Sequence, residues 1–255
     1  MQRVSEIDPV AIMRELGVDG PHSASVLAAN RGKGVWRIQG DSGAFALRVL
    51  RPDEHETALL EQRAMDAARA AGAPAPEVVA AGAWQRRPVM LLSWCEGETL
   101  RDALRKRPGM AFRLGLACGR KQARLHELAA PASLAAAPWL TRFGPVDPEL
   151  RERLEGIEKP HSSLLHLDFH MDNVLVSGGQ VTGLVDWTNA CAGDHRADIA
   201  RTWSLLTRRT GAGARTRATA LLWRLVSGGW QRGYEQVAGR QDDMLLFGFG
   251  PSRAC

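Results

Sequence analysis

Several kinds of segment are scarce in this sequence, and each scarcity argues against a class of protein. No run approaches the roughly 18 consecutive apolar residues that a membrane-spanning helix needs. The charged N-terminal stretch MQRVSEIDPVAIMREL lacks the apolar core of a secretion signal. The four cysteines are far apart and form no CxxC pair, so structural zinc and redox motifs have no support. We therefore expect a cytoplasmic protein with reduced thiols and no membrane partner.

Lysine is also rare, and most of the positive charge comes from scattered arginines. The formal net charge of +5 suits an anionic ligand such as a nucleotide. No basic run is interleaved with aromatic residues, as is typical of nucleic-acid-binding surfaces, so we expect no nucleic-acid partner. There is no internal repeat, and 255 residues with 45% hydrophobic content predict one large domain or two lobes sharing an interface.

The pattern of residues changes near Ser93–Gly97. Before this point, short β-branched or aromatic segments alternate with Gly-containing turns, which predicts an antiparallel sheet with one main helix. The expected strands cover 25–29, 34–39, 44–50, 77–81 and 88–94, and the expected helix covers 53–71. Beyond Gly97, amphipathic patterns predict helices over 99–107 and 110–129 and again from 196, with a hairpin over 173–185. The sequence therefore predicts an α+β fold with a small β-sheet lobe and a larger, mostly helical lobe.

The densest polar cluster is HLDFHMDN at 166–173, followed by GLVDW at 183–187. A Ser-Gly-Gly turn lies between them and favours a hairpin, which would place Asn173 and Asp186 at the same end of two neighbouring strands. A carboxylate and an amide oxygen suit Mg²⁺, which also needs phosphate oxygens and water. A second carboxylate, Asp168, could accept a proton from an attacking hydroxyl. These are the groups that phosphoryl transfer requires.

The spacing HxDxxxxN, followed by a hydrophobic residue, Asp and Trp, resembles the catalytic and metal motifs of the aminoglycoside phosphotransferase and choline kinase-like family. Further matches follow in the family's order along nearly the whole chain: the 30–36 turn, ALRV at 46–49, LLSWCEG at 91–97, Leu125-His126 and the 193–200 segment. The resemblance implies the two-lobed protein-kinase fold. Residues 1–94 would form the nucleotide-binding lobe and 95–255 the helical lobe with the catalytic loop and substrate site, joined by a hinge at about 93–97.

The resemblance also implies roles for single residues, all of them in binding ATP and Mg²⁺ or in catalysis. Asp168 would be the catalytic base, and Asn173 and Asp186 would bind Mg²⁺. Arg48 would contact the α- and β-phosphates, with Glu61 holding it in place. Main-chain groups would supply the rest of the nucleotide site, with Ser93 and Cys95 at the adenine edge and Gly32 and Gly34 at the phosphates.

Some of these positions depart from the family or have a simpler interpretation. The Gly-rich turn has only G-x-G, and arginine stands where lysine is usual at position 48, which keeps the charge but changes its shape. Arg48 could also be a solvated strand residue. Glu61 shares its helix with Glu54 and Glu56, so it could belong to a solvated acidic face.

The function predicted from these residues is ATP-dependent transfer of the γ-phosphate to a hydroxyl of a small molecule, an antibiotic or a metabolite, by a monomer or weak dimer. The alternative is a non-catalytic nucleotide-binding pseudokinase with a regulatory role. A protein kinase is disfavoured because Asp-Trp replaces the Asp-Phe-Gly of those enzymes. Acids are few from Arg201 to Cys255, whereas pockets for polycationic antibiotics need carboxylates. This does not favour an aminoglycoside acceptor, although the arginines of that region could simply face water.

Overall fold

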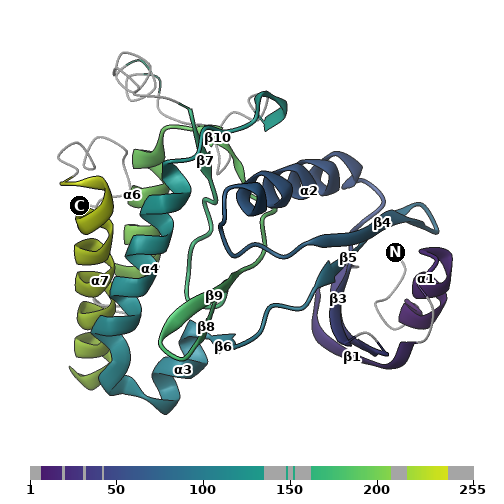
Figure 1. Cartoon of the computed structure of the whole chain (residues 1–255), viewed down its shortest axis with the longest axis horizontal. Helices are drawn as coiled ribbons and strands as arrows, with labels where there is room; N and C mark the ends of the chain where they lie inside the picture. Colours follow the sequence, from purple (N-terminus) through teal and green to yellow (C-terminus); the bar gives the residue numbers. More distant parts are fainter. Residues whose placement is uncertain are drawn as a thin grey trace.

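The computed structural model describes residues 7–18, 21–30, 33–41, 43–134, 148, 152, 162–207 and 217–240. A β-rich part and a mostly helical part lie side by side (Figure 1). The β-rich part contains α1 (Pro9–Glu15), β1 (Pro21–Asn30), β2 (Lys33–Gly40), β3 (Gly43–Val49), α2 (His55–Ala70), β4 (Val78–Trp84) and β5 (Arg87–Ser93). The helical part contains β6 (Glu98–Thr99), α3 (Leu100–Lys106), the 3-10 helix η2 (Pro108–Met110), α4 (Ala111–His126), the 3-10 helix η3 (Ala132–Leu134), β7 (Ser163–Leu165), β8 (Val174–Ser177), β9 (Gln180–Leu184), β10 (Cys191–Gly193), α6 (His195–Thr207) and α7 (Arg217–Ala238).

The first five strands form one antiparallel sheet in the order β1-β2-β3-β5-β4. Side chains alternate between its two faces, so Trp36 and Ile38 of β2 are buried while Arg37 between them is exposed. The buried face packs on Ile12 and Met13 of α1. By the same alternation, Arg48 of β3 lies on the opposite face from its buried neighbours Leu47 and Val49. On that face it reaches Asp186 of the helical part.

Helix α2 lies between the sheet and the helical part (Figure 1). Its inward face is made of small or apolar residues with one exception, the buried carboxylate Glu61. Residues of α2, β5, α3, α4 and the β8–β9 hairpin belong to a single hydrophobic cluster. The two parts of the molecule therefore share a core, and a charged side chain on α2 can reach the boundary between them.

The segment that joins the two parts is held against the β8–β9 hairpin. Gly97 has a φ of 123°, and a Cβ at this position would lie 2.7 Å from the Val176 carbonyl oxygen, so only glycine fits there. The Thr182 hydroxyl donates to the Glu96 carbonyl at 2.6 Å. Strand β6 then pairs with β8, so the end of this segment is bound to the strand that follows Asn173.

Helices α4 and α7 pack in parallel, with their backbones almost in contact. Two glycines on each helix, four residues apart, line the interface. A Cβ added to any of them would meet a carbonyl oxygen of the facing helix at 1.9–2.3 Å; these residues are Gly115, Gly119, Gly229 and Gly233. The interface also contains a polar contact, because Trp230 Nε1 donates a hydrogen bond to Gln122 Oε1 at 2.8 Å.

The predicted elements are present, with ends shifted by a few residues. Helix α1 and the short strands β6, β7 and β10 were not predicted, and the C-terminal helical region contains the two helices α6 and α7. The N-terminus of α1 is fixed by Asp8, whose carboxylate accepts the backbone N–H groups of Val10 and Ala11. No helix within the described ranges is long and apolar enough to cross a membrane.

Candidate active site

The β8–β9 hairpin brings Asn173 and Asp186 together. Val174 pairs with Leu184, and the Val185 N–H donates to the Asn173 carbonyl at 3.0 Å. The two polar residues thus leave the hairpin from the ends of adjacent strands, as the sequence pattern predicts. Asp186 has a φ of 62°, a left-handed conformation that is uncommon outside glycine and frequent at functional sites.

Asn173 also closes the loop that contains Asp168. Its side-chain amide donates to the Asp168 carbonyl at 3.1 Å and to the Asp168 carboxylate at 3.3 Å. Asn173 is buried, while the Asp168 side chain keeps 19% of its surface exposed. A carboxylate that is held in place and still accessible can serve a reacting hydroxyl.

The loop is anchored from below by the buried carboxylate of Asp198 on α6. This carboxylate accepts the backbone N–H groups of His166 at 2.9 Å and Leu167 at 3.0 Å. The same group lies 3.0 Å from Nε2 of His126 on α4, whose Nδ1 lies 2.8 Å from the Tyr234 hydroxyl on α7. Because the carboxylate can only accept, Nε2 donates to Asp198, and Nδ1 accepts from Tyr234. Three helices therefore hold the start of the loop.

The ionised form of Asp198 favours this anchor. Burial alone would raise the pKa of Asp198, but the hydrogen bond from His126, and further contacts with His166, hold that pKa below its ordinary value. Asp198 is therefore ionised at neutral pH and accepts all of these hydrogen bonds. Burial lowers the pKa of His166, which packs against Trp187 and Phe169. In this structure His166 packs within the loop, and Asp198 anchors the start of that loop.

A second cluster forms where Arg48 of β3 meets Glu61 of α2 and Asp186. Arg48 Nε lies 3.3 Å from Glu61 Oε2, and its Nη2 lies 3.0 Å from Asp186 Oδ1. The arginine is largely buried, with 15% of its side chain exposed, so it is not a solvated strand residue. Glu61 is buried as well, whereas Glu56 is exposed and Glu54 pairs with Lys33 at 2.8 Å.

The pKa values in this cluster follow from burial and from the shared guanidinium. Burial alone would raise the pKa of Asp186, but the Arg48 charge and the hydrogen bonds from Thr188 and Arg48 lower it below its ordinary value. Burial raises the pKa of Glu61, and the nearby Asp186 charge adds to this effect, while Arg48 opposes it. Asp186 is therefore the more firmly ionised of the two carboxylates.

Thr188 completes the cluster, and the sequence interpretation did not include it. Its hydroxyl donates to Asp186 Oδ1 at 2.7 Å and accepts from Arg48 Nη2 at 2.5 Å. The only signal in the sequence was its position two residues after Asp186. The hydroxyl links the cation to the carboxylate and so restricts the side-chain orientation of Asp186.

The remaining predicted positions lie near the end of β5 and near the turn between β1 and β2. The Ser93 N–H already donates to the Glu77 carbonyl at 2.8 Å, which leaves only the Ser93 carbonyl for a ligand. Cys95 is partly buried, and burial raises the pKa of its thiol. A Cβ at Gly34 would collide with the Trp36 indole, which is a packing reason for glycine there. Gly32 lies outside the described residues.

Asp186 offers Mg²⁺ a carboxylate and Asn173 an amide oxygen, and both are ligands that this ion prefers. Within the described ranges, no three His, Cys, Asp or Glu side chains are grouped so that they could hold a metal ion by themselves. A site made of Asp186 and Asn173 would therefore depend on phosphate oxygens and water for its other ligands, which is the usual arrangement for Mg²⁺ bound with a nucleotide. The oxygen ligands of Asp186 and Asn173 are therefore of the type that Mg²⁺ binds.

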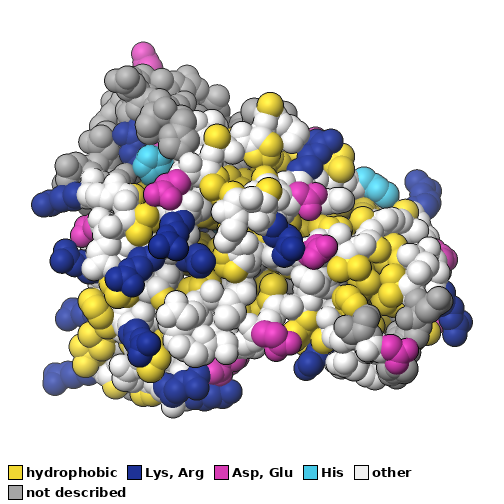
Figure 2. Space-filling view, in the orientation of Figure 1, with side chains coloured by type: hydrophobic (Ala, Val, Ile, Leu, Met, Phe, Trp, Pro, Cys, Tyr) yellow, Lys and Arg dark blue, Asp and Glu magenta, His cyan; other side chains and the backbone are white. Residues whose placement is uncertain are grey.

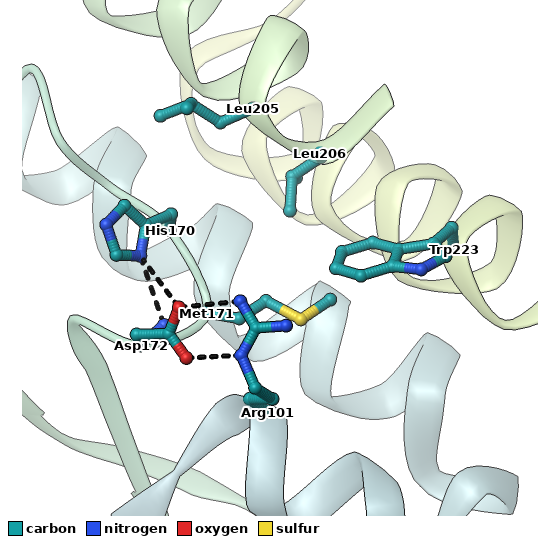
Figure 3. Close-up of a pocket in the computed structure, with 7 residues that line it drawn as sticks. All are labelled: Arg101, His170, Met171, Asp172, Leu205, Leu206 and Trp223. Atoms are coloured by element: carbon teal, nitrogen blue, oxygen red, sulfur yellow. Dashed lines mark hydrogen bonds and ion pairs between the residues drawn. The ribbon is translucent and has the colours of Figure 1, made fainter. Parts of the chain in front are cut away.

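A cavity of about 230 Å³ adjoins the Asp168 loop. It lies between that loop, the start of α3, the end of α6 and the start of α7 (Figure 3). Its lining is Arg101, His170, Met171, Asp172, Leu205, Leu206 and Trp223. The Arg101 N–H donates to the Met171 carbonyl at 3.1 Å, so the wall formed by α3 is tied to the loop itself.

Comparisons with solved structures support the same fold. An aminoglycoside phosphotransferase from Streptomyces rimosus aligns over 95% of this chain and 96% of its own, with 16% identity and a TM-score of 0.65. A macrolide 2'-phosphotransferase from Brachybacterium faecium aligns over 92% of this chain and 84% of its own, with 19% identity and a TM-score of 0.53. An aminoglycoside phosphotransferase crystallised with AMP-PNP and hygromycin B aligns over 94% of this chain and 97% of its own, with 16% identity and a TM-score of 0.60.

These identities are low, so the likeness shows the fold, which is the predicted two-lobed, kinase-like α+β architecture. A comparison with curated protein sequences found no match. A family model, described as the phosphotransferase enzyme family, matches residues 24–238. That match spans most of the sheet, the segment that joins the two parts, the Asp168 loop and the hairpin that precedes Asp186. The chain belongs to the phosphotransferase enzyme family.

Proposed function

We propose that the protein transfers the γ-phosphate of ATP to a hydroxyl of a small molecule. The observation that carries the proposal is the convergence of Asp168, Asn173 and Asp186, through the hairpin register and the Asn173–Asp168 hydrogen bonds. Arg48, held by Glu61 and Asp186, adds a buried cation at the same boundary. Carboxylates, an amide and a fixed cation are the side chains that phosphoryl transfer uses.

In the proposed reaction, the acceptor oxygen forms a bond to the γ-phosphorus while the bond from that phosphorus to the β–γ bridging oxygen breaks. ADP leaves, and the hydroxyl proton goes to Asp168. Arg48 would neutralise charge on the α- and β-phosphates. Asn173 and Asp186 would hold Mg²⁺, which supplies further neutralisation of phosphate charge when it is bound.

We further propose that residues 1–94 form the nucleotide-binding lobe and that residues 95–255 carry the catalytic loop and substrate site. The five-stranded sheet ends at Ser93, and the next strand, β6, pairs with β8 of the helical part. This supports a hinge at about 93–97. The Ser93 carbonyl and the Cys95 main chain would then meet the adenine, with Gly32 and Gly34 near the phosphates.

The decisive test is Asp168→Asn, measured by ADP release and by ATP binding. We expect turnover to fall by about 10²- to 10⁴-fold, the usual contribution of a positioned base, with little change in the Kd for ATP. Asp66→Asn is a matched control, because it makes the same change on the exposed face of α2. An equal loss of ATP affinity would show that Asp168 is a nucleotide ligand instead. ATP binding by the unaltered protein without ADP release for any acceptor would favour the pseudokinase alternative.

A further inference from the structure

We propose that the cavity beside the Asp168 loop holds the apolar part of the acceptor. We infer that this acceptor is a neutral or singly charged hydroxylated molecule with an aromatic or aliphatic ring, and not a polyamine. This inference rests on the proposed function, since the cavity is an acceptor site only if Asp168 is the base. It adds the chemical class of the acceptor, which is argued from the lining.

The cavity reaches the reacting group through one side chain. His170 lines the cavity, and its Nε2 lies 3.6 Å from the Asp168 carboxylate. The Asp172 N–H donates to His170 Nδ1 at 3.1 Å, so in the neutral ring the proton sits on Nε2 and faces Asp168. A molecule that contacts His170 from the cavity therefore has its neighbouring atoms close to Asp168.

The charges that line the cavity cancel each other. The Arg101 guanidinium binds the Asp172 carboxylate through two hydrogen bonds, one of them 2.6 Å long, in the two-pronged geometry that is strongest for this pair. Arg101 and Asp172 are the only arginine, lysine, aspartate or glutamate residues of the described lining. A polycation entering here would find the Asp172 carboxylate already paired with Arg101, so its charges inside the cavity would lose water without gaining a partner among the lining residues.

The opposite wall is apolar. Figure 3 shows Leu205, Leu206 and Trp223 facing the ion pair across the cavity. The volume of about 230 Å³ is below the roughly 300–1,000 Å³ of sites that enclose drug-sized ligands. It suits one ring of an acceptor, with the indole of Trp223 available for an aromatic or aliphatic contact. The rest of a larger acceptor would remain outside.

The wider surface also disfavours a polycation. On the face shown in Figure 2, basic side chains are spread over the helical part more densely than acidic ones. Helix α4 has several arginines and a lysine but no acidic residue. The resulting positive field would slow the approach of a polycation and leave a neutral molecule unaffected.

The test is isothermal titration of the full chain with Mg·AMP-PNP present, using phenyl β-D-glucoside as the neutral probe and kanamycin as the polycation. We expect the glucoside to bind at least tenfold more tightly than kanamycin. Arg101→Ala exposes the Asp172 carboxylate, and Leu205→Asp adds a new one. Each should shift the ratio of the two Kd values at least tenfold toward kanamycin.

Two matched controls separate charge from other effects. Leu205→Asn has the size of the aspartate but no charge, so it should weaken glucoside binding without a gain for kanamycin. Arg105→Ala removes the same charge from the next turn of α3, where the side chain is 75% exposed, and should leave both Kd values unchanged. If Leu205→Asp does not fold, Arg101→Ala carries the test alone.

The outcomes also separate this proposal from the proposed function. Kanamycin binding as tight as glucoside binding, an unchanged ratio in the folded variants, or no binding of either probe to a protein that binds Mg·ATP would each overturn the acceptor class. All three results leave phosphotransferase activity standing. Failure of the unaltered chain to bind Mg·ATP would instead overturn the proposed function.

Discussion

Two neighbouring glycines of α7, Gly228 and Gly229, should respond to the same substitution with opposite signs. A Cβ at Gly229 would lie 2.2 Å from the Phe112 carbonyl oxygen on α4, whereas a Cβ at Gly228 would meet nothing within 4 Å. Ordinary contact begins at 3.4 Å, so Gly229→Ala requires the two helix backbones to part by about 1.2 Å. Because backbone atoms collide, a side-chain rotation cannot relieve the contact.

The magnitude follows from two opposing effects. Overpacking costs about 1–3 kcal/mol, and a backbone collision belongs near the upper end. Replacing glycine by alanine inside a helix stabilises the folded state by about 1 kcal/mol. We therefore expect Gly229→Ala to lower the free energy of unfolding by about 2 kcal/mol, or Tm by about 4–8 °C for a chain of this size. Gly228→Ala has the same helix-propensity gain without a collision, so it should raise Tm by about 2–4 °C.

The assay is urea unfolding and thermal melting of both variants beside the unaltered protein. A turnover measurement below Tm adds a second readout, because the His126–Tyr234 and Gln122–Trp230 hydrogen bonds cross the same interface at 2.8 Å. Parting the helices should break them and loosen the Asp168 loop. A stable Gly229→Ala variant, or a loss in Gly228→Ala as large as that in Gly229→Ala, would refute the reasoning.

Three further predictions concern the two polar clusters. Arg48→Met should raise the KM for ATP and lower turnover, and Glu61→Gln should do less because it acts only by orienting Arg48; equal effects in steady-state kinetics would contradict this order. Thr188→Val should weaken Mg²⁺-dependent nucleotide binding about tenfold, since an unsatisfied polar contact costs about 1–3 kcal/mol. Thr188→Ser keeps the hydroxyl and should bind the nucleotide like the unaltered protein. Identical Mg²⁺ titration curves for the two variants would show that the hydroxyl has no role. The lowered pKa of Asp198 means that its stabilisation is complete above the unfolded pKa of about 3.9 and is lost as pH falls through the lower folded value. Urea unfolding should therefore show that Asp198→Asn lowers the free energy of unfolding by about 3 kcal/mol at pH 7. The variant should also lose less stability than the unaltered protein as the pH falls. An unchanged pH dependence of stability would show that Asp198 does not cause the acid-side loss.

The parts of the site that sequence reasoning located are those fixed by local rules. The Ser-Gly-Gly turn and the strand alternation determine that Asn173 and Asp186 share one end of the hairpin, and that Arg48 faces away from Leu47 and Val49. The contact between Arg48 and Glu61 depends on how α2 packs, and the buried face of that helix supplies it. Their roles in nucleotide binding remain predictions.

Contacts between distant segments could not be predicted in the same way. Gln122 and Trp230 meet because four glycines let α4 and α7 approach, and a glycine inside a helix pattern by itself indicates only a weaker helix. A threonine at position 188 indicates nothing specific in the sequence, because its role depends on its contact with Arg48, which is 140 positions away. The cavity takes its lining from three helices and a loop, so no single stretch of sequence describes it.

The support of the Asp168 loop has a consequence for synthesis of the chain. His126 and Tyr234 are separated by 108 positions, so at about 5–20 residues per second the ribosome makes α4 roughly 5–20 s before the partner that completes the anchor. During that interval the face of α4 that contains Gly115 and Gly119 has no helix to cover it, although the residues of the five-stranded sheet are already synthesised. A nascent chain can therefore assemble its β-rich part early, while the loop with the proposed base becomes fixed only when α7 docks.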